Sequence, residues 1–121
     1  MGTRLNSDRS SEEAKRRRKQ AGMYLKNLRN NTGMTQKELA QKVGLEYYTF
    51  VSQIENGSGR VPVELYGNFA EAYEVDTQAF SRFLIHLYDP ALYDWLFYHS
   101  QEQSIEDQYL ELIASLPRVS K

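Results

Sequence analysis

Apolar residues recur at intervals of three and four positions along most of this chain, as Phe80, Phe83, Leu84 and Leu87 do. That spacing places the residues on one face of an α-helix, whereas a half-buried β-strand needs strict alternation. No stretch of the sequence sustains such alternation, and no segment repeats another. The sequence therefore predicts an all-α protein whose helices are joined by short connections.

Two short helices are predicted on either side of Gly44. Thr35 stands as the N-cap of the first, and Glu38 three residues later completes a capping box. This helix is expected from about Thr35 or Gln36 to Val43, and Gly44 supplies the residue that a tight exit needs. The second helix is expected over 47–56, where a glycine-rich stretch ends it.

Residues that cap or interrupt helices predict where the remaining helices begin in the sequence. Ser10 with Glu13 predicts the start of a long first helix, after a disordered tail over 1–11. Four further helix starts are expected at Pro62, at Asp76 or Thr77, at Asp89 with Pro90, and at Ile105. The resulting domain prediction is a five-helix unit over 12–88 and an aromatic helical extension over 89–121.

The formal net charge of -1 conceals two halves of opposite sign. Residues 1–60 carry 12 Lys and Arg against 6 acids, a net charge of +6, whereas residues 61–121 carry 3 against 10, a net charge of -7. A half this basic suggests a polyanionic partner, which the acidic half would repel. The two halves are therefore expected to have different tasks.

The composition argues against several classes of protein. The chain has no cysteine, which excludes a disulfide scaffold, a thiolate metal site and a thiol nucleophile. Neither a secretory signal nor a stretch near membrane-spanning length occurs, so a cytoplasmic location is expected. His86 and His99 lack metal-ligand spacing, and no Gly-rich phosphate loop or nucleophile elbow is present. We expect no enzyme activity, metal, cofactor or membrane partner.

The sequence around the two short helices resembles the Cro/XRE-type helix-turn-helix family of phage repressors. The resemblance lies in Thr35-Gln36-Lys37-Glu38-Leu39-Ala40, in the turn residue Gly44, in Ile54-Glu55-Asn56-Gly57, and in Pro62. It extends from about Gln20 to Phe80, and the ordered combination is more specific than any one part. The resemblance implies a double-stranded DNA partner, a nucleoid-associated location, and a structural part for Glu55, for which we expect Arg29 as the partner.

Base recognition is assigned to the outward residues of the second short helix, which such proteins place in the major groove. With Val51 and Ile54 facing inward, the outward set is Tyr48, Thr49, Ser52 and Gln53. A glutamine suits adenine, and the hydroxyl groups suit a base edge or the thymine methyl. The segment from Gly44 to Glu55 is one residue longer than is common in that family. A longer turn or a helix start at Tyr47 or Tyr48 therefore remains open, and Phe50 is expected to pack partly in the core.

Contacts to the DNA backbone are assigned to polar and basic residues around this set. Gln36 stands in the first turn of its helix, where its side chain and unpaired N–H groups suit a phosphate. The full set is Gln36, Lys37, Asn56, Arg60, Arg17 and Arg18. A solvated helical face is the alternative for the basic run over 15–19. Glu46 would repel phosphate or accept a hydrogen bond from a cytosine amino group.

The second half predicts contact with another chain, because its ten aromatic residues from Tyr66 to Tyr98 exceed what a small five-helix core needs. A homodimer would present two reading helices one DNA turn apart. Its interface is assigned to Tyr88, Leu92, Trp95 and Leu96. We therefore predict a homodimeric repressor that binds an inverted-repeat operator. The alternatives are an antitoxin-like or adaptor protein whose C-terminal helices bind a protein partner, and a pocket for a small effector.

Overall fold

A computed structural model describes residues 3–97, 103–114 and 116, with side chains from Ser11 onward. The helices in chain order are α1 (Thr3–Thr32), α2 (Gln36–Val43), α3 (Thr49–Asn56), the 3-10 turn η1 (Val63–Leu65), α4 (Tyr66–Tyr73), α5 (Thr77–Tyr88), α6 (Pro90–Phe97) and α7 (Ile105–Ala114). The described residues contain no strand, so the all-α prediction is confirmed. Tyr98 and His99 lie outside the described residues.

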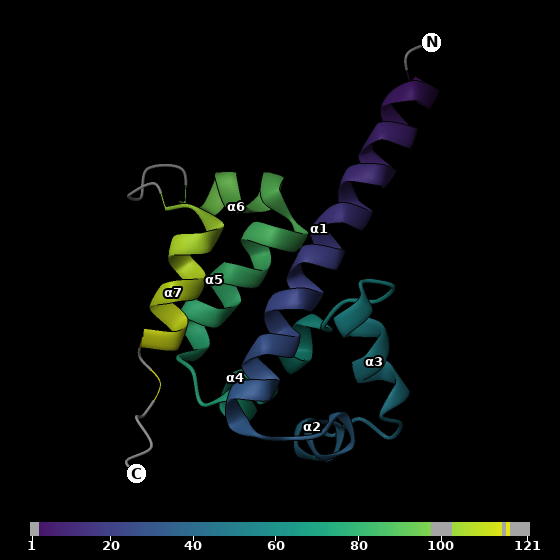
Figure 1. The fold of residues 1–121 in the computed structure, drawn as a ribbon. Coiled ribbons are helices and arrows are strands. Elements are labelled where there is room, and N and C mark those ends of the chain that lie inside the picture. The colour runs from purple at the N-terminus through teal and green to yellow at the C-terminus, as the bar shows by residue number, and fades with distance from the viewer. Residues whose placement is uncertain (1–2, 98–102, 115, 117–121) are drawn as a thin grey trace.

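The long helix α1 organises the fold (Figure 1). It packs against α3 on one side and α5 on the other, and α4 also contacts it. α2 packs against α3 and α4, whereas α6 and α7 both pack against α5. The N-terminal part of α1 projects beyond the other helices. The fold thus places α2 and α3 on one side of α1, and the two C-terminal helices on the other.

A single hydrophobic core joins these helices, and most of the aromatic residues of the second half belong to it. Its buried aromatic side chains are Tyr66, Phe69, Tyr73, Phe80, Phe83 and Tyr88. Tyr24 of α1 extends the contact to α7, since its ring lies 5.3 Å from that of Phe83 and 4.5 Å from that of Tyr109. The aromatic content that suggested a partner surface is therefore largely used inside the chain.

The predicted start of the first helix at Ser10 is wrong, because α1 begins at Thr3 and includes most of the segment expected to be disordered. A residue added to an existing helix needs no new nucleus, so a helix can extend beyond its best capping signal. Glu13 forms ion pairs with Arg16 and Arg17, which lie three and four residues further along α1 and so on the same face of it.

Signals further along the chain predict the helix starts more closely. The carboxylate of Asp76 accepts a hydrogen bond from the N–H of Ala79 at 2.9 Å and caps α5, as one of the two expected residues. Pro90 is the first residue of α6, as expected. Pro62 departs from the prediction, because it precedes η1 rather than standing in the first turn of α4.

α1 and α3 approach closely at Gly22, a contact that the sequence reasoning did not identify. A Cβ atom at this position would lie 2.2 Å from the carbonyl oxygen of Glu55 and 2.7 Å from that of Ile54. No side chain fits there unless one helix moves. An isolated glycine within a helical pattern is the signal that would have found it.

Gly22→Ala is expected to lower the free energy of unfolding by about 1–3 kcal/mol or more, because the added methyl group forces α1 away from α3. Urea denaturation followed by circular dichroism measures the change. Gly67→Ala in α4 is the matched control, since a Cβ atom there meets nothing within 4 Å. The control should be neutral or stabilise by up to about 1 kcal/mol, as alanine favours a helix over glycine. Equal effects of the two substitutions would contradict the close contact.

Candidate nucleic-acid interface

The start and end of α2 have the predicted geometry. Thr35 Oγ1 accepts a hydrogen bond from the N–H of Glu38 at 3.0 Å, and the N–H of Thr35 donates to the Glu38 carboxylate at 2.9 Å. The predicted capping box is therefore confirmed. Gly44 follows α2 with a φ of 84°, in the left-handed region that favours glycine.

The turn between α2 and α3 takes up the extra residue. α3 begins at Thr49 with Tyr48 as its N-cap, so the prediction of a helix start at Tyr47 is wrong and the longer turn is correct. The N–H groups of Phe50 and Val51 donate to carbonyl groups three residues earlier, at 3.1 and 3.0 Å. These hydrogen bonds form a tight turn just before the regular bonding of α3, in which each N–H donates to the carbonyl group four residues earlier.

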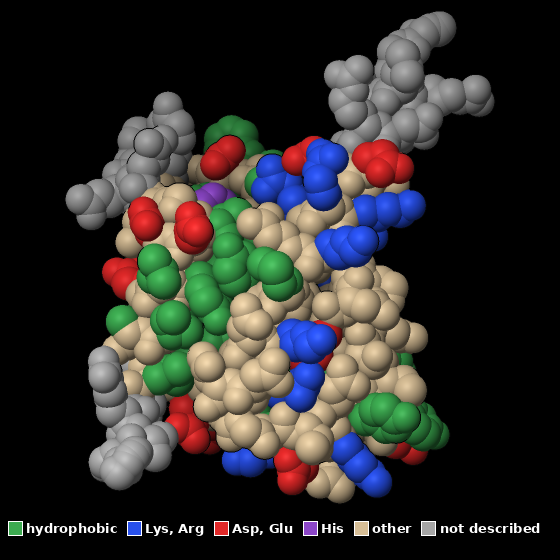
Figure 2. Space-filling view, viewed as in Figure 1, with side chains coloured by type: hydrophobic (Ala, Val, Ile, Leu, Met, Phe, Trp, Pro, Cys, Tyr) green, Lys and Arg blue, Asp and Glu red, His purple; other side chains and the backbone are tan. Residues whose placement is uncertain are grey.

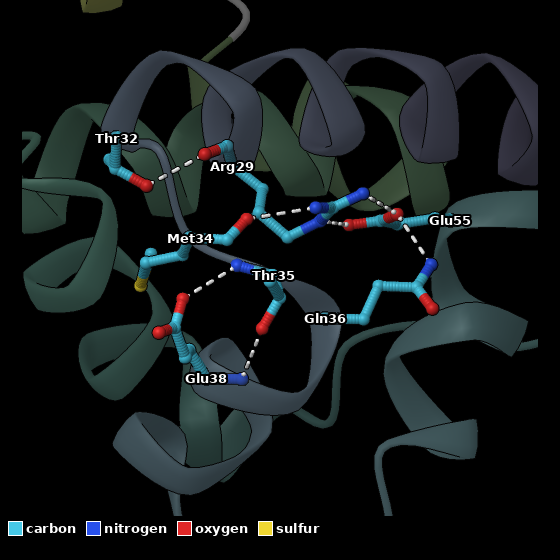
Figure 3. A network of polar contacts seen from close by, with 7 residues as sticks. All are labelled: Arg29, Thr32, Met34, Thr35, Gln36, Glu38 and Glu55. Atoms are coloured by element: carbon cyan, nitrogen blue, oxygen red, sulfur yellow. Dashed lines mark hydrogen bonds and ion pairs between the residues drawn. The ribbon is translucent and has the colours of Figure 1, made fainter.

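A buried ion pair connects α1 to the end of α3 (Figure 3). Arg29 Nε donates to Glu55 Oε2 at 2.7 Å, and Arg29 Nη2 donates to Glu55 Oε1 at 3.0 Å. Both residues are only 9% exposed. Arg29 Nη1 also donates to the carbonyl oxygen of Met34 at 2.9 Å, and the hydrogen bond to Glu55 raises the pKa of Arg29. The predicted pairing of Arg29 with Glu55 is confirmed.

Gln36 adds α2 to this network. Its Nε2 atom donates to Glu55 Oε1 at 3.0 Å, so its side chain faces the protein network (Figure 3). The first turn of α2 still carries N–H groups that have no partner within the helix. An open hollow of about 570 Å³ lies beside this turn, and it is lined by Arg29, Thr35, Gln36, Lys37 and Tyr48. Lys37 is the exposed basic side chain in this lining, since Arg29 is buried and bonded to Glu55.

The four residues assigned to base recognition lie on one side of α3, and we call them the recognition face: Tyr48, Thr49, Ser52 and Gln53. Thr49 and Gln53 are exposed, Tyr48 is 51% exposed, and Ser52 is half-buried. The opposite side of α3 carries Val51 and Ile54, which are buried as predicted. Phe50 is 46% exposed and lies outside the core, contrary to the prediction. Val51 and Ile54 take the inward side of α3, so Phe50, next to Val51, stays on its surface.

Basic residues of α1 meet the loop that follows α3. Arg18 Nε donates to the carbonyl oxygen of Gly57 at 3.1 Å, so this side chain holds α1 against the end of α3. Asn56 Oδ1 accepts from the N–H and the hydroxyl of Ser58, at 2.9 and 2.7 Å. We call the open hollow of about 580 Å³ at this junction the basic hollow; it is lined by Glu12, Lys15, Arg16, Arg18, Lys19, Asn56, Gly57 and Ser58. Figure 2 shows Lys and Arg side chains gathered over this part of α1.

Arg17 and Arg60 are less available to a phosphate than the sequence suggests. Arg17 is half-buried, and its Nη2 atom lies 3.6 Å from the Glu13 carboxylate. Arg60 donates two hydrogen bonds to Asp89, from Nη2 at 2.6 Å and from Nη1 at 3.3 Å. The bond to Asp89 raises the pKa of Arg60. A phosphate at Arg60 would have to compete with this carboxylate.

The structure corrects one member of the predicted dimer interface. Tyr88 is only 7% exposed, because it completes the apolar face of α5 and packs in the core. Its hydroxyl oxygen accepts a hydrogen bond from the N–H of Val61 at 3.2 Å, and burial raises its pKa to about 12. The guanidinium of Arg60 lies 4.4 Å from the centre of its ring. Tyr88 is therefore not available to a second chain.

The other three members of that predicted interface lie on the surface of α6. Leu92 is 46% exposed, Leu96 is 56% exposed and Trp95 is 86% exposed. No residue of α6 is buried, although the helix packs against α5. An apolar helix this exposed is typical of a contact surface.

His86 of α5, Tyr93 of α6 and Gln108 of α7 form a chain of polar contacts that joins these three helices. His86 Nδ1 lies 2.8 Å from Gln108 Oε1, and Gln108 Nε2 donates to the hydroxyl of Tyr93 at 3.0 Å. The His86 and Tyr93 rings stack at 3.8 Å. Over the described ranges, acidic and histidine side chains form no group of three that could hold a metal ion. None of the helices described there is long and apolar enough to span a membrane.

A family model described as a helix-turn-helix domain matches residues 13–83, which is more than half of the chain. The matched range runs from the N-terminal half of α1 to the middle of α5 and includes the whole α2–turn–α3 unit. No curated protein and no solved structure matched the chain significantly.

Glu55→Gln is expected to lower the free energy of unfolding by about 3 kcal/mol or more, because it leaves the charge of Arg29 buried without a counterion. Urea denaturation measures the loss. Glu13→Gln is the matched control, since it removes an exposed carboxylate that also pairs with arginines. The control should change stability by less than about 1 kcal/mol. If Glu55→Gln were as mild as the control, the buried pair would not be holding α3.

Proposed function

The chain belongs to the helix-turn-helix domain family, and we propose that it is a transcription regulator that binds double-stranded DNA sequence-specifically through α3. The recognition face is the observation that carries this proposal. It presents hydroxyl and amide groups to solvent on a short helix whose other side is held by the core and by the Glu55 ion pair. Side chains held in this way suit the donors and acceptors that base pairs display in the major groove.

The residues around the recognition face suit the DNA backbone. Lys37, at the start of α2, lines the same hollow as Tyr48, which precedes α3. The basic hollow lies at the other end of α3. Phosphate contacts at both ends would set the position of α3 along the groove without adding sequence preference. We assign these contacts to Lys37, Asn56 and the basic side chains of the hollow. Gln36 acts indirectly, by holding Glu55 and thereby α3.

We further propose that the regulator is a homodimer formed through Leu92, Trp95 and Leu96 of α6, which together expose an apolar surface. One helix-turn-helix unit contacts too few base pairs for genomic specificity, whereas two related by a twofold axis bind half-sites about 34 Å apart. Such a dimer on an inverted-repeat operator would repress by occupying DNA that a polymerase needs. This role belongs to the cytoplasm, where the nucleoid lies. A protein partner on the same surface remains the alternative.

Gln53→Ala is expected to weaken binding to the selected operator about 5- to 150-fold, because one good contact to adenine contributes about 1–3 kcal/mol. The operator is first selected from a random-site library with the full chain at two salt concentrations. Affinities of the wild type and the variant are then measured by fluorescence anisotropy on that operator and on a shuffled duplex. The loss should appear on the operator and not on the shuffled duplex.

Gln78→Ala is the matched control for that experiment, since it removes the same side chain from an exposed position at the start of α5. It should leave both affinities unchanged. Enrichment of no sequence, together with binding that disappears at the higher salt, would contradict the proposed function. The basic half would then be a general polyanion surface.

Trp95→Asp is expected to convert a dimer into a monomer of 14.1 kDa, because it places a charge in the centre of the proposed apolar interface. Light scattering at several protein concentrations measures the mass. Leu110→Asp is the control, as Leu110 is a 53% exposed apolar residue on α7, outside the interface. A wild-type protein that stays monomeric at high micromolar concentration would contradict the homodimer and favour a protein partner.

A further inference from the structure

Three aromatic side chains lie exposed at the start of α3, and we call them the aromatic patch: Tyr47, Tyr48 and Phe50. Their exposed fractions are 58%, 51% and 46%. The rings of Tyr47 and Phe50 lie 6.2 Å apart. Figure 2 shows a hydrophobic area at the lower right, over the turn between α2 and α3. Clustered aromatic exposure of this kind marks a contact surface.

The aromatic patch adjoins the polar groups of the recognition face. Phe50 and Gln53 together line an apolar hollow of about 250 Å³, whose other lining residues are Leu45, Ile54, Gly59, Arg60 and Pro62. Tyr48 lines the separate hollow beside the first turn of α2. A partner that reaches Thr49 and Gln53 therefore also meets aromatic carbon.

The recognition face and the aromatic patch include no lysine or arginine, the side chains that commonly recognise guanine. No Lys or Arg occurs between Lys42 and Arg60, and Arg60 itself is held by Asp89. Guanine presents two acceptors, O6 and N7, in the major groove, and arginine or lysine is their commonest partner. The groups that these six residues do present are four hydroxyls, two of them phenolic, together with one amide and three aromatic rings. The amide suits adenine N6 and N7, and apolar carbon suits the thymine methyl.

We propose that α3 selects A·T base pairs, with the aromatic patch packed against thymine methyl groups and Gln53 bonded to adenine. This assignment rests on the proposed function and adds to it the base composition of the half-site. Glu46, exposed in the same turn, carries the opposing chemistry, because its carboxylate accepts from the amino group of cytosine. A selected site whose binding depends on Glu46 would therefore count against the proposal.

The test uses the full chain and the operator selected from the random-site library. Each thymine of a half-site is replaced in turn by deoxyuridine, which pairs identically and lacks only the methyl group. Affinity should fall about fourfold at each contacted position, since burial of one apolar carbon contributes about 0.8 kcal/mol. Deoxyuridine in the flanking sequence should have no effect.

Variants of the aromatic patch then test whether its side chains are the ones that contact the methyl groups. In Phe50→Ala and Tyr47→Ala, binding to the thymine operator should weaken, and the further loss on the contacted deoxyuridine should shrink to less than twofold. Leu110→Ala removes an equally exposed apolar side chain from α7, and it should keep the full fourfold loss. Thermal unfolding of each variant confirms that the fold is intact.

The outcomes separate this inference from the proposed function. Suppose that an operator is enriched and that the chain binds it equally tightly with deoxyuridine in place of any thymine. That result would overturn the inference and leave sequence-specific binding in place. An operator of G·C pairs that loses affinity with Glu46→Gln would do the same. If no sequence is enriched, the proposed function fails and the inference fails with it.

Discussion

The buried ion pair between Arg29 and Glu55 is the contact on which the position of α3 depends. A carboxylate near the end of a helix opposes the helix dipole, and its burial costs solvation. Both costs are offset because Glu55 accepts two hydrogen bonds from Arg29 and one from Gln36. Arg29 in turn satisfies the carbonyl of Met34, at the link between α1 and α2. One carboxylate thus joins the first three helices of the fold.

Two further contacts hold α1 against the end of α3 beside this ion pair. α1 has only a hydrogen atom at Gly22 where the backbone of α3 passes, and Arg18 holds the loop beyond α3 through the carbonyl of Gly57. α3 is therefore fixed to α1 at its C-terminal end, at Ile54 and Glu55 and at the following Gly57. A helix held in this way gives up little conformational freedom when it binds, which favours affinity and a defined register.

The sequence predicts best the features that depend on neighbouring residues. Thr35, Glu38 and Gly44 determine the bounds of α2 through bonds within a few positions, and these were predicted correctly. The pairing of Arg29 with Glu55 was also predictable, because a carboxylate at a helix end needs a cation. The start of α1 was not, since helix extension depends on propagation rather than on a cap.

Features that depend on packing between helices were predicted less well. Tyr88 continues the apolar spacing of α5 and is buried, whereas Phe50 lies on α3 beside the buried Val51 and is exposed. Both are aromatic residues within amphipathic helices, and only the direction of the neighbouring helices distinguishes them. The inward bond of Gln36 has the same origin, because it requires Glu55 from a helix further along the chain.

The loop after α3 is also bonded to the junction between α5 and α6, which has a consequence for any dimer formed on α6. Arg60 pairs with Asp89, and the N–H of Val61 donates to the buried hydroxyl of Tyr88. Asp89 immediately precedes α6, so its bonds to Arg60 tie the start of that helix to the loop. The path from α6 to α3 therefore consists of packed and hydrogen-bonded structure rather than a flexible linker. In a dimer built on α6, the separation of the two recognition faces would be a property of the folded chain, and only operators with one half-site spacing would engage both.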